Sequence, residues 1–371
     1  MEKAAPIATH ARVDFVAKQS DPSRQSSQNY TAPKREPARN QKQNRPSQND
    51  SSQMEPLEIV SGRWLVKAIL LALVAAGVAL YFTVCLLFYQ GQWQFAFSSH
   101  PSASVSAASI ASSTGLPIQD IKFDYTEEGV ARLDGWWIPA TSVSAQSDST
   151  ASTNGARLLV VLFYPSGRST LPANIDVLRA FHTLGVSVFA FDYRGLGQSQ
   201  PGHPSQTKAY EDGMAALQYL IGMRHIDSHR IVLYGAEAGS AVASHVAQQS
   251  PQIAGLILEN PQPSFTRQVK REQHIHLLPI WLIFRQSFDI SKIVPTLKMP
   301  KLVIATSAKP EYPAGASEIF KQASGPKQKA VFNVNDTKTL YAQSGWKQAI
   351  GEFLNNLNAR SNSDKPVAPK R

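Results

Sequence analysis

One apolar run constrains this chain more than any other feature. Ala68–Tyr89 holds 22 residues without a charged side chain, which as a helix is long enough to cross a hydrocarbon core of about 30 Å. Arg63 and Lys67 precede the run, and the next Lys or Arg after it is Lys122. Because the cytoplasmic flanks of membrane helices are rich in Lys and Arg, we predict a single-pass helix at residues 63–92, with the N-terminus inside and the C-terminal part outside.

Two other interpretations of the run are a cleaved signal peptide and a buried core helix. A signal peptide has a short leading region, whereas 67 residues precede this run. A core helix is rarely apolar on every face. The chain has a single cysteine, Cys85, which lies inside the run. One cysteine excludes a disulfide within the monomer and a cysteine-rich zinc site. A disulfide-free domain suits a bacterial inner membrane, and we expect the domain on its periplasmic side.

Residues 1–62 are expected to form a disordered cytoplasmic tail. From Asn29 to Gln53 there is no Val, Ile, Leu, Met, Phe or Trp, so this stretch cannot bury enough surface to offset its chain entropy. The net charge of +10 is diffuse, with +4 on residues 1–67 and +6 on the remainder. Without a dense basic block, nucleic acid is not an expected partner, and the tail is expected to be solvated and weakly attracted to lipid.

A globular domain is expected over residues 93–358, followed by a disordered tail at 359–371. Its strand-like runs are apolar on both faces and alternate with stretches of helical spacing, which predicts an α/β fold with a mostly parallel, doubly wound sheet. The strand-like runs are Ile121–Tyr125, Arg132–Pro139, Arg157–Tyr164, Val186–Tyr193, Arg230–Tyr234, Ala254–Leu258, Lys301–Thr306 and Ala330–Val334. The first two suggest a hairpin, and the small-residue stretches Pro101–Gly115 and Thr141–Gly155 are expected to be loops.

The chemistry of a doubly wound sheet lies beyond the carboxyl ends of its strands. Tyr234–Ser240 follows one such strand and places glycines two residues on either side of Glu237. This spacing is that of a nucleophile elbow, G-x-S-x-G, in which the glycines permit a tight strand–turn–helix. Two further loops, Tyr164–Ser169 and Phe191–Ser199, follow neighbouring strands and are expected at the same edge.

These segments resemble the alpha/beta hydrolases, in particular a membrane-anchored group similar to serine aminopeptidases and acyl esterases. Gly185–Ser199 is similar to that group's sheet-and-turn segment, and Arg230–Ala243 is similar to its elbow. Phe288–Ile293 and Met299–Ile304 resemble the run into its acid-bearing strand. The resemblance implies an alpha/beta-hydrolase fold with a small cap inserted at about residues 260–298, and no metal or cofactor.

The group's catalytic residues are replaced at the matching positions. Glu237 stands where the serine nucleophile belongs, Lys309 stands at the acid position, and Thr337 stands at the histidine position. No histidine follows His276, so a shifted register does not restore the base, whereas the nearby Glu311 leaves a displaced acid open. We expect all three replaced positions to be inactive.

The oxyanion loop of the group normally begins with His-Gly, and here the corresponding residues read Tyr-Pro-Ser-Gly. The resemblance places Ser166, Gly167 and Ala238 in this role. One hypothesis is that Glu237 and Lys309 form an ion pair that fills the former catalytic centre. The other is that the two have drifted independently in a dead site.

Other polar residues are weaker candidates. Ser240 lies just past the elbow and faces no obvious base. Four histidines are expected to be surface or packed residues: His203 after the Phe191–Ser199 turn, His245 on the elbow helix, and His274 and His276 in the expected cap.

The expected cap combines basic residues with the apolar run Leu277–Phe284. The basic residues are Arg267, Lys270, Arg271, His274 and His276. This composition suits a lid packed on the pocket, or a surface that meets the membrane or a lipid-like ligand.

The sequence therefore predicts a membrane-anchored pseudoenzyme that binds a small ligand or a protein partner. The alternative is an active hydrolase of ester or amide bonds with a non-standard centre at Glu237. A third possibility is a binding protein that acts through its N-terminal tail, with the domain as a passive mass.

Overall fold

The structure is a computed structural model that describes residues 61–97, 105–124, 133–140, 159–272 and 278–363. The chain divides into the units Met1–Ser61 and Gly62–Arg371, and the helices and strands belong to the second unit. The expected N-terminal tail lies almost wholly outside the described residues, as does the expected loop Thr141–Gly155.

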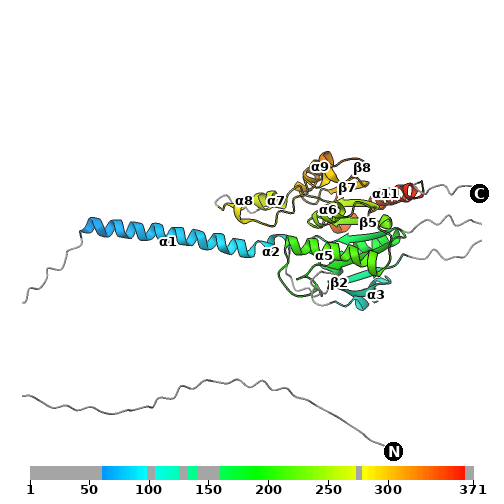
Figure 1. The fold of residues 1–371 in the computed structure, drawn as a ribbon, viewed down its shortest axis with the longest axis horizontal. Coiled ribbons are helices and arrows are strands. Elements are labelled where there is room, and N and C mark those ends of the chain that lie inside the picture. Colours follow the sequence, from blue (N-terminus) through cyan, green and yellow to red (C-terminus); the bar gives the residue numbers. More distant parts are fainter. Residues whose placement is uncertain (1–60, 98–104, 125–132, 141–158, 273–277, 364–371) are drawn as a thin grey trace, which may run out of the picture. The chain divides into compact units, whose positions relative to one another are not determined.

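The apolar run forms one continuous helix, α1 (Gly62–Gly91), drawn in blue in Figure 1. Its 30 residues extend about 45 Å at 1.5 Å per residue. None of its side chains is buried, and Leu71 is 71% exposed. Within the described part of the chain, α1 is the one helix long and apolar enough to span a membrane. This exposure is unlike that of a core helix.

Eight strands form one sheet in the order β1-β2-β4-β3-β5-β6-β7-β8. They are β1 (Gln119–Phe123), β2 (Leu133–Ile138), β3 (Val160–Tyr164), β4 (Ser187–Asp192), β5 (Ile231–Ala236), β6 (Gly255–Glu259), β7 (Lys301–Thr306) and β8 (Lys327–Phe332). The pairs β1–β2 and β2–β4 are antiparallel, and all the other pairs are parallel. The predicted α/β fold with its initial hairpin is confirmed.

Helices cover both faces of the sheet. One face packs on α4 (Ile175–Thr183) and α11 (Ser344–Ser363), and the other packs on α5 (Gln206–Gln218) and α6 (Gly239–Gln249). Alternate residues of β3 enter the two cores, with Leu162 on the α6 side and Val161 on the α4 side. Burial on both faces explains why the inner strands read as continuous apolar runs.

Three local predictions were wrong. Ala107–Thr114 forms a helix, α3, inside an expected loop, because Ser106 caps its N-terminus and Gly115 ends it at φ 70°. β8 begins three residues before the predicted run, because this edge strand starts with polar, partly exposed residues. α11 continues to Ser363, five residues into the expected C-terminal tail.

The segment between β6 and β7 holds two short helices, α7 (Phe265–Glu272) and α8 (Ile280–Ile283), in the stretch expected to form the cap. The remaining short helices near the site are α2 (Trp93–Ala96), which continues the chain from α1, α9 (Glu311–Gln322), and α10 (Thr337–Leu340).

Candidate functional site

The turn from β5 into α6 has the geometry of a nucleophile elbow with Glu237 at its tip. Glu237 has φ 49°, in the left-handed region that residues other than glycine rarely adopt. A Cβ at Gly235 would lie 2.6 Å from the Ser240 Cα, and one at Gly239 would lie 2.2 Å from the Tyr164 oxygen. The backbone approaches so closely at both positions that only glycine fits.

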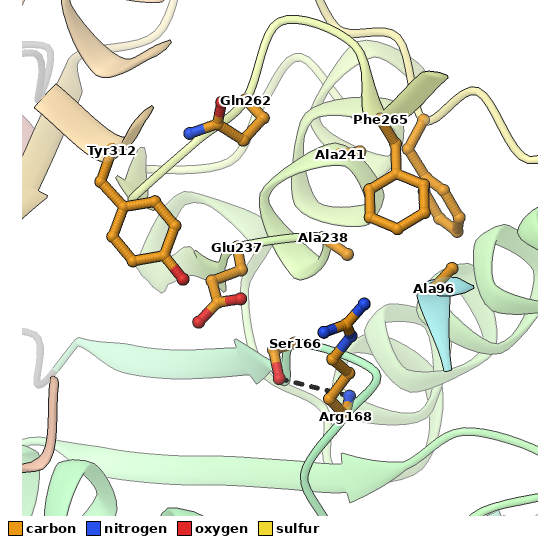
Figure 2. Close-up of a pocket in the computed structure, with 10 residues that line it drawn as sticks. Ala96, Ser166, Arg168, Glu237, Ala238, Ala241, Gln262, Phe265 and Tyr312 are labelled. Carbon is orange, nitrogen blue, oxygen red and sulfur yellow. Dashed lines mark hydrogen bonds between the residues drawn. The ribbon is translucent and has the colours of Figure 1, made fainter. Parts of the chain in front are cut away.

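Glu237 lies half-buried in a narrow cleft (Figure 2). The residues that line the cleft are Ala96, Ser166, Arg168, Glu237, Ala238, Ala241, Gln262, Phe265, Phe288 and Tyr312. They come from α2, the loop after β3, the elbow, the cap and α9. One wall is therefore aromatic and apolar, and the other carries the charged and hydrogen-bonding groups.

Tyr312 is a polar neighbour of Glu237 in the cleft. The Tyr312 side chain is buried, and Figure 2 shows its hydroxyl and the Glu237 carboxylate pointing toward each other. The hydroxyl makes no hydrogen bond of normal geometry within the described residues. Burial raises the pKa of Tyr312 well above its ordinary value, and the Glu237 charge raises it further. The phenol is therefore neutral and can donate a hydrogen bond to an anion at the elbow.

The hypothesised ion pair between Glu237 and Lys309 is not formed as a direct contact. No ion pair within 4.0 Å joins them among the described residues. The Lys309 Nζ instead lies 5.1 Å from the centroid of the Tyr312 ring, a cation–π distance. The physical reason is that the first turn of α9 presents Tyr312 to both residues.

The loop after β8 does not bring Thr337 into the lining of the cleft. Thr337 begins α10, where the Asp336 carboxylate accepts a hydrogen bond from the Lys338 N–H at 3.0 Å. The Ser307 hydroxyl joins this loop to the end of β7 by donating to Asn333 Oδ1 at 2.7 Å. The one carboxylate of the loop thus serves as a helix cap.

Two of the three residues assigned to the oxyanion loop, Ser166 and Ala238, lie in the cleft beside Glu237, whereas Gly167 does not line it. Gly167 has φ 80°, and a Cβ there would lie 2.9 Å from the Ala96 oxygen. Its backbone therefore packs against α2. The Arg168 guanidinium also reaches this helix and donates to the Phe95 oxygen at 2.5 Å.

Sequence reasoning missed Glu259, the last residue of β6. Its side chain is 2% exposed and accepts hydrogen bonds from the hydroxyls of Tyr234 and, at 2.9 Å, Tyr341. The Glu237 N–H donates to the Glu259 backbone oxygen at 2.8 Å, so this carboxyl lies directly behind the elbow. Burial raises the pKa of Glu259 to about 7, with a smaller contribution from the Glu237 charge and against the effect of the two tyrosines. The sequence feature that could have indicated this residue is a carboxylate at the end of an otherwise apolar strand, Gly255–Glu259.

Among the described residues that line the cleft there is no histidine, and the serine among them is Ser166 of the loop after β3. The His245 ring stacks on Tyr210 with centroids 4.1 Å apart, and burial lowers its pKa. His203 packs against Trp93 at 5.0 Å. The Ser240 hydroxyl is buried and donates to the Gly235 oxygen at 2.8 Å. His274 and His276 lie outside the described residues.

Comparison with known proteins finds relatives of this chain both in sequence and in fold. The family described as serine aminopeptidase, S33, matches residues 169–325. The uncharacterized protein Rv2307c of Mycobacterium tuberculosis is 32% identical over 207 residues, which cover 56% of this chain and 68% of that protein. The chain belongs to the alpha/beta hydrolases.

Further relatives of this alpha/beta hydrolase match shorter stretches or the fold. The Arabidopsis thaliana alpha/beta hydrolase domain-containing protein WAV2 is 35% identical over 102 residues, 27% of this chain and 33% of WAV2. The Pyrococcus furiosus esterase Pf2001 superposes with a TM-score of 0.52 at 21% identity, over 70% of this chain and 98% of the esterase. An alpha-beta hydrolase from Vibrio vulnificus superposes with a TM-score of 0.53 at 18% identity, over 71% of this chain and 90% of that hydrolase. At such identities the structural likeness concerns the fold alone.

Proposed function

We propose that this chain is a membrane-anchored alpha/beta-hydrolase-fold protein that binds a ligand or partner at its cleft without serine-hydrolase chemistry. The observation that carries the proposal is the elbow. It keeps its tight backbone, but it presents the Glu237 carboxylate to Tyr312 in place of a hydroxyl to a histidine.

The chemistry of acyl transfer supports this proposal. A serine nucleophile needs a base to take its proton and an acid to orient that base. Losing them costs factors of roughly 10⁴ to 10⁶ in rate. The position after β8 carries Thr337, and the chain has no histidine beyond His276. Lys309, at the acid position, contacts an aromatic ring.

A second candidate function is hydrolysis of an ester or amide bond with Glu237 as nucleophile or general base. The specific observation in its favour is that Glu237 keeps the strained φ of an elbow residue and lines the cleft. Strained backbone of this kind clusters at functional sites. Tyr312 would donate to negative charge developing beside Glu237.

One experiment separates the two functions. The full-length protein in detergent is treated with a fluorophosphonate probe and assayed with short-chain esters, alongside Glu237→Ala, Glu237→Ser and the control Glu352→Ala on an exposed face of α11. The binding proposal expects no labelling and no turnover by any folded variant. Turnover by the wild type that Glu237→Ala abolishes and Glu352→Ala retains would establish the second function. Labelling of Glu237→Ser would reveal a base and overturn the argument from the missing histidine.

The anchor and its topology belong to the same proposal. We propose that α1 crosses a bacterial inner membrane with its N-terminus in the cytoplasm and the domain in the periplasm. The support is the length and exposure of α1 and the basic residues Arg63 and Lys67 before it. A C-terminal alkaline phosphatase fusion should be active and a C-terminal green fluorescent protein fusion dark; the reverse pattern would refute the orientation. Deletion of residues 1–60 without a phenotype would argue against a function carried by the tail.

A further inference from the structure

The end of α1 is joined to the cap by specific contacts. The Phe88 ring in the last turns of α1 lies 6.2 Å from the Phe284 ring, which directly follows α8. Gln92 is 5% exposed, and its Oε1 accepts a hydrogen bond from the Arg285 N–H at 2.5 Å. Its Nε2 donates to the Tyr89 oxygen at 2.8 Å. The buried amide of Gln92 thus ties the chain after α8 to the point where α1 ends.

This attachment leaves α8 beside α1 with an apolar side chain in the open. Within α8, Ile280 is buried, whereas Leu282 is 62% exposed. Few large apolar side chains outside α1 are as exposed in the described residues. Because α8 contacts α1, the exposed Leu282 adds an apolar side chain beside a helix that has no buried residue, and exposed apolar patches mark interaction sites.

Cationic side chains flank this apolar surface. Arg267 and Lys270 are exposed on α7, and Arg285 is exposed just after α8. Arg267 also pairs with Glu318 at 2.9 Å. Apolar residues bordered by Lys and Arg are the composition of segments that lie in a membrane interface, where the apolar side chains enter the acyl region and the cations meet anionic headgroups.

A chain of aromatic rings leads from this surface to the cleft. The Phe284 ring lies 6.2 Å from the Phe265 ring, and Phe265 lies 6.0 Å from Phe288. Phe265 and Phe288 both line the cleft that holds Glu237. The apolar wall of the cleft is therefore continuous with the surface beside α1.

We propose that the cap helices α7 (Phe265–Glu272) and α8 (Ile280–Ile283) form a second membrane contact, which rests in the interface of the leaflet that α1 leaves, with Leu282 among the acyl chains. The proposal deepens the proposed function and rests on α1 crossing the bilayer. In this proposal the lipid bilayer is the partner of the cap, and the aromatic wall of the cleft lies close to the membrane surface.

Depth-dependent fluorescence quenching tests this proposal on the full-length protein. It is placed in nanodiscs of phosphatidylcholine and phosphatidylglycerol, with or without bromine on the upper part of the acyl chains. A small environment-sensitive fluorophore is attached to Cys85 in the wild type, or to Leu282→Cys or Val331→Cys in a Cys85→Ser background. Val331 is the matched control, because it is 59% exposed on the edge strand β8. Tryptophan fluorescence confirms that each labelled protein is folded.

The expected result is that brominated lipid removes most of the fluorescence at Cys85 and Leu282 but leaves Val331 unchanged. Quenching at Cys85 with none at Leu282 would overturn the cap contact while leaving the anchor intact. Equal quenching at Leu282 and Val331 would also overturn it, because the fluorophore itself would then be seeking lipid. No quenching at Cys85 would overturn the membrane anchor of the proposed function, and the cap contact with it.

Discussion

Replacing Glu259 by glutamine should change how the stability of the domain depends on pH. Burial raises the pKa of Glu259 from its ordinary 4.5 to about 7 in the folded protein. The folded state therefore holds this proton more tightly than the unfolded chain does. Its contribution to stability is complete below pH 4.5 and is lost as the pH rises through 7. The difference of about 2.5 in pKa corresponds to about 3 kcal/mol.

Glutamine cannot ionise, and its amide can still exchange hydrogen bonds with the hydroxyls of Tyr234 and Tyr341. We therefore expect Glu259→Gln to match the wild type within about 1 kcal/mol at pH 5 and to exceed it by about 3 kcal/mol at pH 8. The assay is urea unfolding of the full-length protein in nanodiscs, followed by tryptophan fluorescence at several pH values. Glu352→Gln, on the exposed face of α11, is the control. A stability difference for Glu259→Gln that does not change between pH 5 and pH 8 would refute the reasoning.

Two further predictions concern the close backbone packing at the elbow and the buried ion pair between Arg194 and Asp212. Gly239→Ala should cost at least about 3 kcal/mol, because its Cβ would lie 2.2 Å from the Tyr164 oxygen. The control is Gly351→Ala in α11, where the added Cβ would lie 3.9 Å from its nearest atom and the substitution should slightly raise Tm. Similar Tm values for the two variants would contradict the elbow geometry. Asp212→Asn should cost about 3 kcal/mol, because the buried Asp212 carboxylate accepts from the Arg194 N–H at 2.8 Å and from its Nε at 2.5 Å. The control is Asp176→Asn, which removes an exposed ion pair with Arg179 at 3.5 Å and should change the free energy of unfolding by no more than about 0.5 kcal/mol. Chemical denaturation measures both variants, and an equal loss of stability in the two would show that burial does not set the cost.

Most of the fold could be predicted because its signals are local. The inner strands are buried on both faces, so Val186–Tyr193 and Arg230–Tyr234 are mostly apolar, and the glycines on either side of Glu237 mark the elbow. The prediction failed where a short-range cap or an edge position outweighed composition. Ser106 and Gly115 delimit a helix in a stretch rich in serine and alanine, and β8 begins with polar residues because it is the edge strand of the described sheet.

The candidate site could be predicted only by position. Sequence order places Glu237, Lys309 and Thr337 after β5, β7 and β8, but it does not say which side chains then meet. That depends on contacts between segments far apart in the chain. The first turn of α9 presents the Tyr312 ring to Lys309, and the pairing of β5 with β6 brings the Glu259 carboxyl behind the elbow.

The sequence by itself determined that this chain has one long apolar helix before a parallel α/β domain, and that its elbow carries a carboxylate. Both follow from the order and spacing of residue types along the chain, which do not depend on how distant segments pack. Only the tertiary structure decided that Glu237 faces Tyr312, that Glu259 is a buried carboxyl beside it, and that Gln92 joins α1 to the cap. Burial and long-range hydrogen bonding set those partners, and neither is a property of a local stretch of sequence.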